Sequence, residues 1–253
     1  MSSSRPRPVI GVTTTFEPNG RVPERLHSAL LAGYSDAVYA AGGLPLALLA
    51  PPEPDSRQID QLLARCDGLL LSGGDDLPPT VYGQPAHPAT RPMHARRARF
   101  ELLVCQRADA LGLPMLGTCL GHQLLHVARG GRLWQDLAAL ELTPRVRHHL
   151  EIDENTFHHV RVVPDSLLAR VLGADRLETN SRHHQAVDPQ QPGRDLRAVA
   201  LADDGVIEAS EDPRPGRFVL AVQWHPEDLI DRREHLALFA ALVEAAQQRR
   251  AAR

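Results

Sequence analysis

The sequence predicts an α/β fold in which a central, mostly parallel sheet is flanked by helices. Short apolar segments typical of buried strands alternate with segments of helical periodicity from the start of the chain. A Gly-Gly turn follows one strand-like segment, and a cysteine flanked by glycines follows another. Because reactive groups in such folds gather at the carboxyl ends of the strands, we expect a functional site at that edge of the sheet.

The first part of the sheet is predicted from three short apolar segments and the two helical segments between them. The first helix is expected to end at Gly42 and Gly43, and the second to begin at an N-cap formed by Asp55 or Ser56. The last strand opens into a polar turn at Gly73. The predicted strands are residues 8–14, 44–49 and 68–71, and the predicted helices are residues 26–41 and 56–65.

The middle of the chain predicts a strong amphipathic helix, a short strand and a second helix. Residues 95–111 have helical periodicity, and the apolar run 113–116 follows directly. The next helix, residues 120–129, is expected to end at the two glycines that follow it. The chain therefore turns sharply from strand to helix at Cys119.

The C-terminal part predicts four more strands and a closing amphipathic helix. Residues 141–159 are polar, carry four histidines and show no clear period, so we expect an insertion or a flap near the site. No internal repeat is present and the linker-like stretch 188–194 is short, so residues 1–253 are expected to form a single domain with residues 1–7 flexible. The predicted strands are residues 160–163, 198–202, 206–210 and 218–224, and the helix is residues 233–249.

Composition narrows the class of protein. With 253 residues, of which 43% are hydrophobic, the chain can bury a sizeable core. A net charge of −3 gives no attraction to nucleic acid or to a membrane surface, and all 28 basic residues are arginine, which excludes catalysis by lysine. The N-terminus lacks the apolar stretch of a signal peptide and no apolar run is long enough to span a bilayer, so we expect a soluble, cytoplasmic protein.

Cys119 has the surroundings of a catalytic nucleophile. At a strand-to-helix corner the backbone doubles back, so small residues are needed two positions before and two positions after the nucleophile. Gly117 and Gly121 meet this need. The corner also places the cysteine at a helix N-terminus, whose partial positive charge favours a thiolate.

The other two cysteines, Cys66 and Cys105, are expected to be inert residues of the core, as most intracellular cysteines are. The three cysteines form no C-x-x-C pair, which argues against a disulfide framework or a cysteine zinc site. Only Cys119 combines flanking glycines with a strand-to-helix context.

A base for Cys119 is expected at His225, which follows the strand-like run 218–224. Pro226 biases the preceding histidine toward extended geometry, so His225 and Glu227 can point to the same side. The carboxylate can then hold the imidazole N–H and fix its tautomer. Thirteen histidines make one histidine weak evidence, but a histidine followed by Pro-Glu at a strand end is stronger.

These motifs resemble a known superfamily. The sequence G-T-C-L-G-H-Q at residues 117–123, together with Q-W-H-P-E at residues 223–227, resembles the class I glutamine amidotransferases. S-G-G-D-D at 72–76, P-T-V-Y-G at 79–83 and N-S-R-H-H-Q at 180–185 resemble their γ-glutamyl-γ-aminobutyrate hydrolase branch, stand-alone enzymes of polyamine (putrescine) catabolism. The resemblance covers nearly the whole chain and implies a flavodoxin-like domain.

The resemblance also implies roles for individual residues. The implied catalytic triad is Cys119, His225 and Glu227. The implied oxyanion hole consists of main-chain N–H groups of Leu120, Gly73 and Gly74. A glycine loop suits this role because backbone can approach a developing oxyanion closely, and one donor typically lowers the barrier by about 3 kcal/mol.

Three further residues are implied in substrate binding. Gln123 lies one helical turn past Cys119 and, by resemblance, contacts the glutamyl part of the substrate. His183 and Gln185 match the branch motif, and their role as substrate contacts or as supports of the pocket stays open. The chain departs from the branch at Leu120, where arginine is common, and at Ala98, where an aspartate is common. These departures leave the identity of the substrate open and do not touch the triad.

The implied reaction is hydrolysis of a small γ-glutamyl amide, such as γ-glutamyl-GABA, through a γ-glutamyl thioester, without metal or organic cofactor. One alternative is a glutaminase subunit that supplies ammonia to a separate synthetase chain. Another is a metal-binding protein built on the histidine doublets, which the sequence disfavours because adjacent histidines on a strand point apart. A pseudoenzyme is disfavoured because every triad position is filled. The amine half of the substrate and homo-oligomerisation stay open.

Overall fold

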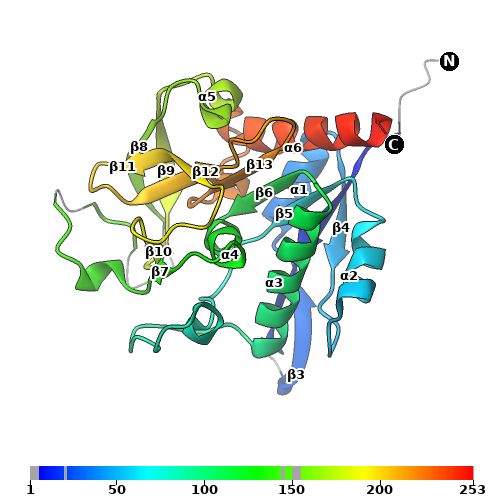
Figure 1. Ribbon diagram of the computed structural model, residues 1–253, viewed down its shortest axis with the longest axis horizontal. Helices are drawn as coiled ribbons and strands as arrows, with labels where there is room; N and C mark the ends of the chain where they lie inside the picture. The colour runs from blue at the N-terminus through cyan, green and yellow to red at the C-terminus, as the bar shows by residue number, and fades with distance from the viewer. Residues whose placement is uncertain (1–5, 20–21, 144–145, 150–154, 253) are drawn as a thin grey trace.

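The computed structural model describes residues 6–19, 22–143, 146–149 and 155–252 (Figure 1). Its centre is a nine-stranded mixed sheet with the order β4-β1-β5-β6-β13-β12-β11-β8-β9. The predicted α/β class, with helices flanking a central sheet, is confirmed. No helix in these four ranges is both long enough and apolar enough to cross a membrane.

Five neighbouring strands of the sheet are parallel. They are short and apolar; every residue of β5 is buried, as expected where helices cover both faces. The parallel strands are β4 (Leu44–Leu48), β1 (Val9–Thr13), β5 (Gly68–Leu71), β6 (Met115–Thr118) and β13 (Val219–Val222).

The other half of the sheet continues from β13 through antiparallel pairs. Its strands are β12 (Ile207–Glu211), β11 (Arg197–Ala202), β8 (Thr156–Val162) and β9 (Arg176–Ser181). Two small two-stranded sheets lie outside it. They pair β2 (Thr15–Asn19) with β3 (Val22–Ala29), and β7 (Leu133–Trp134) with β10 (Ala186–Val187).

Helices cover both faces of the sheet, and each face has its own apolar core. Alternate strand residues divide between the cores: Leu69 and Leu71 of β5 belong to one, and Leu70 belongs to the other. The first core includes side chains of α2 (Ser56–Leu63), α3 (Ala95–Ala110) and α4 (Leu120–Ala128). The second includes side chains of α1 (Ala32–Ala40), α5 (Leu167–Leu172) and α6 (Arg233–Ala251), the long red helix of Figure 1.

The register of the parallel strands brings the predicted site residues to one edge. Leu71 at the end of β5 pairs with Gly117 of β6, and Val222 at the end of β13 pairs with Thr118. The segments that follow these strands therefore start side by side. They carry the Gly73 turn, Cys119 and His225.

Most predicted elements form within two residues of their expected limits, and Asp55 caps α2 by accepting a hydrogen bond from the Gln58 N–H. The predicted helix 26–41 is wrong in its first part, because residues up to Ala29 pair with β2 as a hairpin. Leu26 and Leu31, which suggested a helix, are 46% and 61% exposed instead of packed.

The predicted flap 141–159 is only partly irregular. Residues 156–159 begin β8, where they pair with β9 instead of forming a flap. Residues 146–149 lack regular secondary structure, and residues 144–145 and 150–154 lie outside the described residues, as do residues 1–5 of the expected flexible N-terminus. Strand β9 and helix α5 were not predicted, because polar and charged residues interrupt their apolar pattern.

Candidate functional site

Cys119 occupies a strained corner between β6 and α4. Its backbone has φ +50° and ψ −106°, a conformation that non-glycine residues rarely adopt. The corner is held by the Cys119 N–H, which donates to the Val222 carbonyl at 2.8 Å. Such strain persists only where the surroundings enforce it, and it turns the side chain out of both strand and helix. The predicted nucleophile elbow is therefore present.

The flanking glycines explain how this corner can form. A Cβ at Gly117 would lie 2.7 Å from the carbonyl oxygen of Gly121. A Cβ at Gly121 would overlap the main-chain carbonyl of Leu71. Neither main-chain group can move without disrupting the strand or the helix, so both positions need glycine.

His225 links Cys119 to Glu227. Nδ1 of His225 lies 2.6 Å from Oε1 of Glu227, and the Cys119 side chain is hydrogen bonded to the same imidazole. All three residues are buried: 7% of Cys119, 5% of His225 and 2% of Glu227 is exposed. The three predicted triad positions thus form one hydrogen-bonded chain in the order thiol, imidazole and carboxylate.

Asn180 fixes the backbone of His225. Its amide nitrogen donates to the His225 carbonyl and its oxygen accepts from the His225 N–H, both at 3.0 Å. This pair of bonds attaches the end of β9 to the segment that follows β13. The imidazole is therefore positioned from its main chain as well as from Glu227.

The environment of His225 favours its charged form. Burial alone would lower the pKa, but the charges of Cys119 and Glu227, together with hydrogen bonds to both, raise the pKa to about 10. An imidazolium is thus stable at neutral pH between two acidic partners. This state is suited to donate a proton to a leaving group.

The main-chain donors near Cys119 differ from the expected set in one respect. The N–H of Gly73 donates to the hydroxyl of Tyr34 at 2.7 Å, so this main-chain donor already has a partner. Within the described part of the chain, no acceptor is paired with the N–H of Gly74 or of Leu120. These two groups remain available for an oxyanion.

Arg97 orients the peptide that carries the Gly74 N–H. Its Nη2 donates to the Gly73 carbonyl at 2.8 Å, and its Nε donates to Oε1 of Glu101 at 2.9 Å. Because the C=O and N–H of a trans peptide point in opposite directions, holding the Gly73 carbonyl directs the Gly74 N–H away from Arg97. The arginine is 2% exposed and Glu101 is fully buried, so this support is rigid.

Tyr34 joins the glycine loop to the triad. Its hydroxyl accepts hydrogen bonds from the Gly73 N–H and from Oγ1 of Thr118, and it lies in the field of the Glu227 carboxylate. Burial, and then the charge of Glu227, hold the Tyr34 pKa well above its usual value. The hydroxyl therefore keeps its proton, which it can donate to the Glu227 carboxylate.

Cys119 and His225 border a cavity of about 420 Å³. Its wall carries charges of both signs, from Arg91 and Arg182 and from Asp75 and Asp76. Such a lining suits a small zwitterionic or multiply charged molecule.

The three predicted substrate contacts all line this cavity, and each also braces it. Gln123 donates to the Gln185 carbonyl at 3.1 Å and to Oε1 of Gln223 at 3.3 Å. Nδ1 of His183 bonds the same Gln185 carbonyl at 3.0 Å. The Gln185 amide nitrogen donates to the Gln135 carbonyl, while its side-chain oxygen is buried without a partner in the described residues.

Sequence analysis missed four residues that position the site: Tyr34, Arg97, Asn180 and Arg182. Tyr34 and Arg97 lie on helices far from Cys119 in the sequence and have no local motif. Asn180 and Arg182 lie in the N-S-R-H-H-Q segment, which was the available signal. Arg182 lines the cavity and has Nη2 3.8 Å from Oε1 of Glu227.

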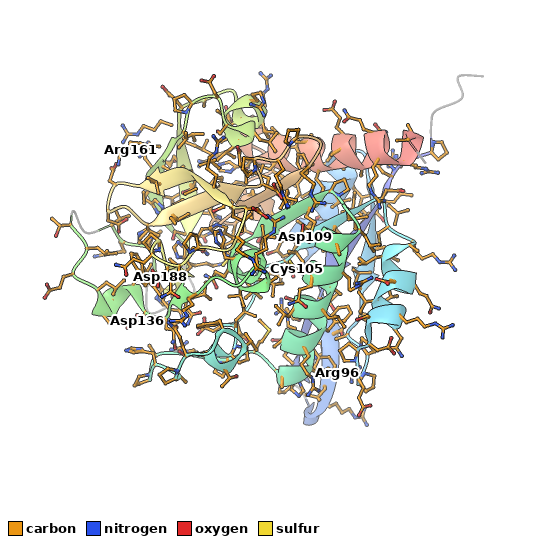
Figure 2. The ribbon with its side chains drawn as sticks, in the orientation of Figure 1. Arg96, Cys105, Asp109, Asp136, Arg161 and Asp188 are labelled. Atoms are coloured by element: carbon orange, nitrogen blue, oxygen red, sulfur yellow. The ribbon has the colours of Figure 1, made fainter. Side chains whose placement is uncertain are left out.

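The other cysteines agree with their expected inert role. Burial raises the pKa of Cys66 to about 11 and that of Cys105 to about 12. Figure 2 shows Cys105 near Asp109 on α3. Both thiols therefore stay protonated and unreactive at neutral pH.

Comparison with known proteins identifies the family. A family model described as Peptidase C26 matches residues 8–227. The chain belongs to the peptidase C26 family. This confirms the expected membership in the class I glutamine amidotransferase-like superfamily.

Two relatives match this peptidase C26 chain over most of their length. A Mycobacterium tuberculosis protein provisionally named a glutamine amidotransferase is 38% identical over 250 residues, covering 95% of this chain and 75% of its own. Protein NtpR of Enterococcus hirae is 36% identical over 197 residues, covering 77% of this chain and 80% of its own. Both support the family.

Solved structures confirm the fold. A Thermoplasma acidophilum protein provisionally described as one subunit of GMP synthase has a TM-score of 0.64 at 16% identity, with 98% of each chain covered. The glutaminase domain of Trypanosoma brucei CTPS with bound acivicin has a TM-score of 0.63 at 17% identity, with 95% of this chain and 94% of its own covered.

Proposed function

We propose that this peptidase C26 protein is a cysteine-dependent hydrolase of small γ-glutamyl amides. The observation that carries the proposal is the buried chain from Cys119 through His225 to Glu227, which ends at a strained elbow facing a cavity. A thiolate paired with an imidazolium is a nucleophile and a proton donor in one unit.

The reaction begins when the Cys119 sulfur attacks the γ-carbonyl carbon of the substrate. The N–H groups of Leu120 and Gly74 donate hydrogen bonds to the developing oxyanion. The imidazolium of His225 gives its proton to the leaving amine as the C–N bond breaks, and a γ-glutamyl thioester remains on the sulfur. The neutral imidazole then removes a proton from water, which attacks the thioester and releases glutamate and the thiolate.

The charges of the cavity favour a glutamyl head group. A γ-glutamyl amide carries an α-carboxylate and an α-ammonium group at the end remote from the amide bond. Arg182 borders the cavity and can attract the carboxylate, while Asp76, an acidic residue of the same lining, can attract the ammonium group. The γ-carbonyl then lies within reach of Cys119. The amine half of the substrate, such as GABA, faces the remaining wall.

A panel of γ-glutamyl amides tests this proposal. The untagged protein is offered γ-glutamyl-GABA, other γ-glutamylated amines and free glutamine, and glutamate release is measured for the wild type and for Cys119→Ala. We expect turnover of at least one γ-glutamylated amine well above that of glutamine, and none by the variant. Equal rates for wild type and Cys119→Ala would reject the mechanism.

The alternative is a glutaminase subunit that feeds ammonia to a separate synthetase. A Chlamydia muridarum CTP synthase is 26% identical over 228 residues, with 37% of its own length covered, which supports this reading. It predicts slow hydrolysis of glutamine alone and activation by a partner chain. Rapid turnover of γ-glutamylated amines by the isolated chain favours the free-standing hydrolase.

A further inference from the structure

A second cluster of titratable side chains lies next to the catalytic cavity and shares His183 with its lining. Three imidazoles surround one carboxylate oxygen, Oε1 of the fully buried Glu208. Nδ1 of His148 lies 3.3 Å from this oxygen, Nε2 of His158 lies 3.2 Å from it, and Nε2 of His183 lies 3.5 Å from it. The mechanism proposed above uses none of these contacts.

His148 and His183 each form a hydrogen bond through the ring nitrogen that points away from Glu208. These bonds determine which nitrogen of each ring carries the hydrogen. Nε2 of His148 lies 2.9 Å from Oδ2 of Asp204, and Nδ1 of His183 lies 3.0 Å from the Gln185 carbonyl. Carboxylate and carbonyl oxygens only accept, so these nitrogens carry the hydrogens. In the neutral form, the opposite nitrogens then present lone pairs to a carboxylate.

The cluster contains buried polar atoms that no protein group satisfies. Nδ1 of His148, Nε2 of His183 and Oε2 of Glu208 have no hydrogen-bond partner among the described residues. Buried acceptor atoms that face one another without a donor between them destabilise the folded state, unless a cation lies between them.

We propose that His148, His158 and Glu208 form a binding site for a divalent transition-metal ion of the zinc class. The three candidate ligand atoms lie within 4.8 Å of one another. Zinc bonds of about 2.0–2.1 Å in tetrahedral geometry place neighbouring ligand atoms about 3.3 Å apart. The separations of 3.3 Å and 3.2 Å between the two imidazoles and Glu208 match that spacing.

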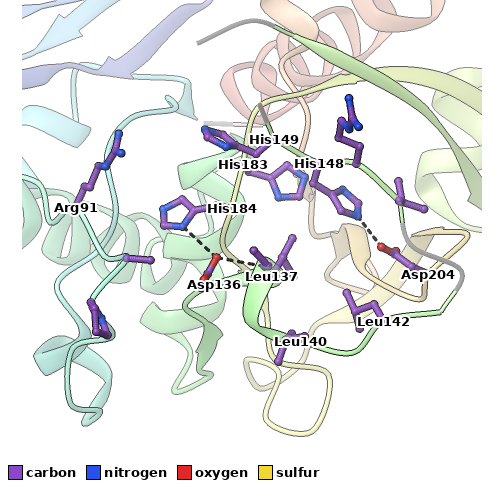
Figure 3. A pocket seen from close by; sticks show the side chains of 15 residues that line it. Arg91, Asp136, Leu137, Leu140, Leu142, His148, His149, His183, His184 and Asp204 are labelled. Carbon is purple, nitrogen blue, oxygen red and sulfur yellow. Dashed lines mark hydrogen bonds and ion pairs between the residues drawn. The ribbon is translucent and has the colours of Figure 1, made fainter. Parts of the chain in front are cut away.

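The surroundings supply the outer contacts that metal sites require. Asp204 holds the remote nitrogen of His148, an arrangement that orients a histidine ligand and raises its basicity. His183 lies beside the three ligands and can bind the ion or orient a water on its open position. An ion can enter through a cavity of about 820 Å³, lined by His148, His183 and Asp204, in which Figure 3 shows His148 directed at Asp204.

The ion would connect three segments that are distant in the sequence. His148 belongs to the irregular segment 146–149, His158 to β8 and Glu208 to β12. The same segment is attached to the end of β9, since Oγ of Ser181 donates to the His148 carbonyl at 2.7 Å. His183 also lines the catalytic cavity, so the metal would hold the wall between the two cavities in place. Its role is therefore structural.

In a competing arrangement, a second proton on the His148 ring takes the place of the metal ion in the cluster. Carboxylate oxygens of Asp204 and Glu208 lie 2.9 Å and 3.3 Å from the two ring nitrogens of His148, so the imidazole can carry a second proton between them. A metal ion must displace this proton, so its binding is expected to release a proton and to weaken as the pH falls. A chain that uses only the proton would bind no metal at this site.

Metal stoichiometry tests the proposal. Untagged protein is stripped with a chelator and titrated with Zn²⁺ by calorimetry, and bound zinc is measured after dialysis. We expect one ion per chain in the wild type and in Cys119→Ala, which excludes binding by the catalytic thiol. His158→Gln should weaken zinc binding at least tenfold, whereas His159→Gln, the neighbouring residue outside the ligand set, should retain it.

Two further readouts, the Co²⁺ spectrum of the wild type and the effect of Zn²⁺ on Tm, guard against a variant that fails to fold. Co²⁺ should give the visible absorption of an ion bound by nitrogen and oxygen, without a thiolate charge-transfer band. Zn²⁺ should raise the Tm of wild type and of His159→Gln but not that of His158→Gln. Absence of stoichiometric zinc in the wild type, or equal affinity in His158→Gln, would overturn the proposal without bearing on the hydrolase reaction.

Discussion

Nδ1 of His225 lies 2.6 Å from Oε1 of Glu227, and both side chains are buried beside the Cys119 elbow. Replacing this carboxylate by an amide removes a charge that raises the imidazole pKa. We therefore predict that Glu227→Gln lowers kcat by up to about 10⁴-fold, the loss seen when a triad carboxylate is replaced by its amide. Steady-state kinetics with the best γ-glutamyl amide measures the effect.

The same variant should change the pH profile. In the proposed mechanism His225 donates the proton. Because its two acidic partners raise its pKa to about 10, kcat/KM of the wild type should decline only as the pH rises toward that value. In Glu227→Gln the alkaline decline should begin at lower pH. Glu178→Gln is the matched control, because this exposed acid pairs with Arg232 instead of His225. Equal pH profiles for wild type and Glu227→Gln would contradict the assigned role.

Arg97 should affect turnover through the oxyanion donor that it orients. Lysine can keep the charge next to Glu101, but it lacks the planar fork that also reaches the Gly73 carbonyl. We predict that Arg97→Lys lowers kcat by about 10- to 100-fold, with a smaller change in KM, since complete loss of one oxyanion donor costs about 10²- to 10³-fold.

Arg96→Lys is the control for this substitution. Arg96 lies at the start of the same helix and donates to the Ala50 carbonyl, outside the catalytic cavity (Figure 2). Its replacement should leave kcat within about twofold of the wild type, an estimate that follows from its lack of contact with the site. If Arg96→Lys lowers kcat as much as Arg97→Lys does, the loss reflects a general sensitivity of α3 to substitution. The specific role assigned to Arg97 would then be contradicted.

Gly121 tests the packing of the elbow. A methyl group at this position would overlap the Leu71 carbonyl, and neither backbone can yield without loss of strand or helix geometry. We predict that Gly121→Ala costs about 1–3 kcal/mol of unfolding free energy, as overpacking of a tight core does, and abolishes turnover. Denaturant unfolding followed by circular dichroism measures the first effect. An alanine variant as stable and active as the wild type would refute the packing argument.

Acid stability should depend on His122. This histidine is buried against Ser210 and Gln223, and burial lowers its pKa to about 4. Between about pH 6.5 and 4 the unfolded chain takes up a proton at this residue that the folded chain does not, so stability falls as the pH falls. We predict that His122→Gln reduces this slope by up to about 1.4 kcal/mol per pH unit, the value for one proton. Urea unfolding across this range decides the matter, and an unchanged slope would contradict the prediction.

Local patterns in the sequence were sufficient to predict much of this fold and site. The glycines around Cys119 predict the elbow because the backbone clash that they avoid involves residues close in sequence. The parallel strands were predicted because burial on both faces makes them short and uniformly apolar. The strand-end motif with His225 and Glu227 was found because both residues belong to one short segment.

The parts that sequence analysis missed depend on contacts between distant segments. Tyr34 reaches the glycine loop only because α1 packs on the sheet, and Gly73 is occupied as a donor for the same reason. The cluster of His148, His158 and Glu208 was not predicted, because its members come from three distant segments. The sequence showed only pairs of neighbouring histidines, and these were judged unable to bind one metal ion. The end of β3, residues 26–29, was mistaken for a helix because hairpin pairing overrides a short helical period.

The most direct test of the account is to trap the covalent intermediate. Wild-type protein is mixed with a γ-glutamyl amide, quenched in acid within one turnover and digested, and the mass of the peptide that contains Cys119 is measured. We predict a γ-glutamyl thioester on Cys119 that accumulates further in Glu227→Gln, where hydrolysis is slowed, and is absent from Cys119→Ala. Hydrolysis of the substrate with no adduct on Cys119, or with undiminished rate in Cys119→Ala, would contradict the central claim.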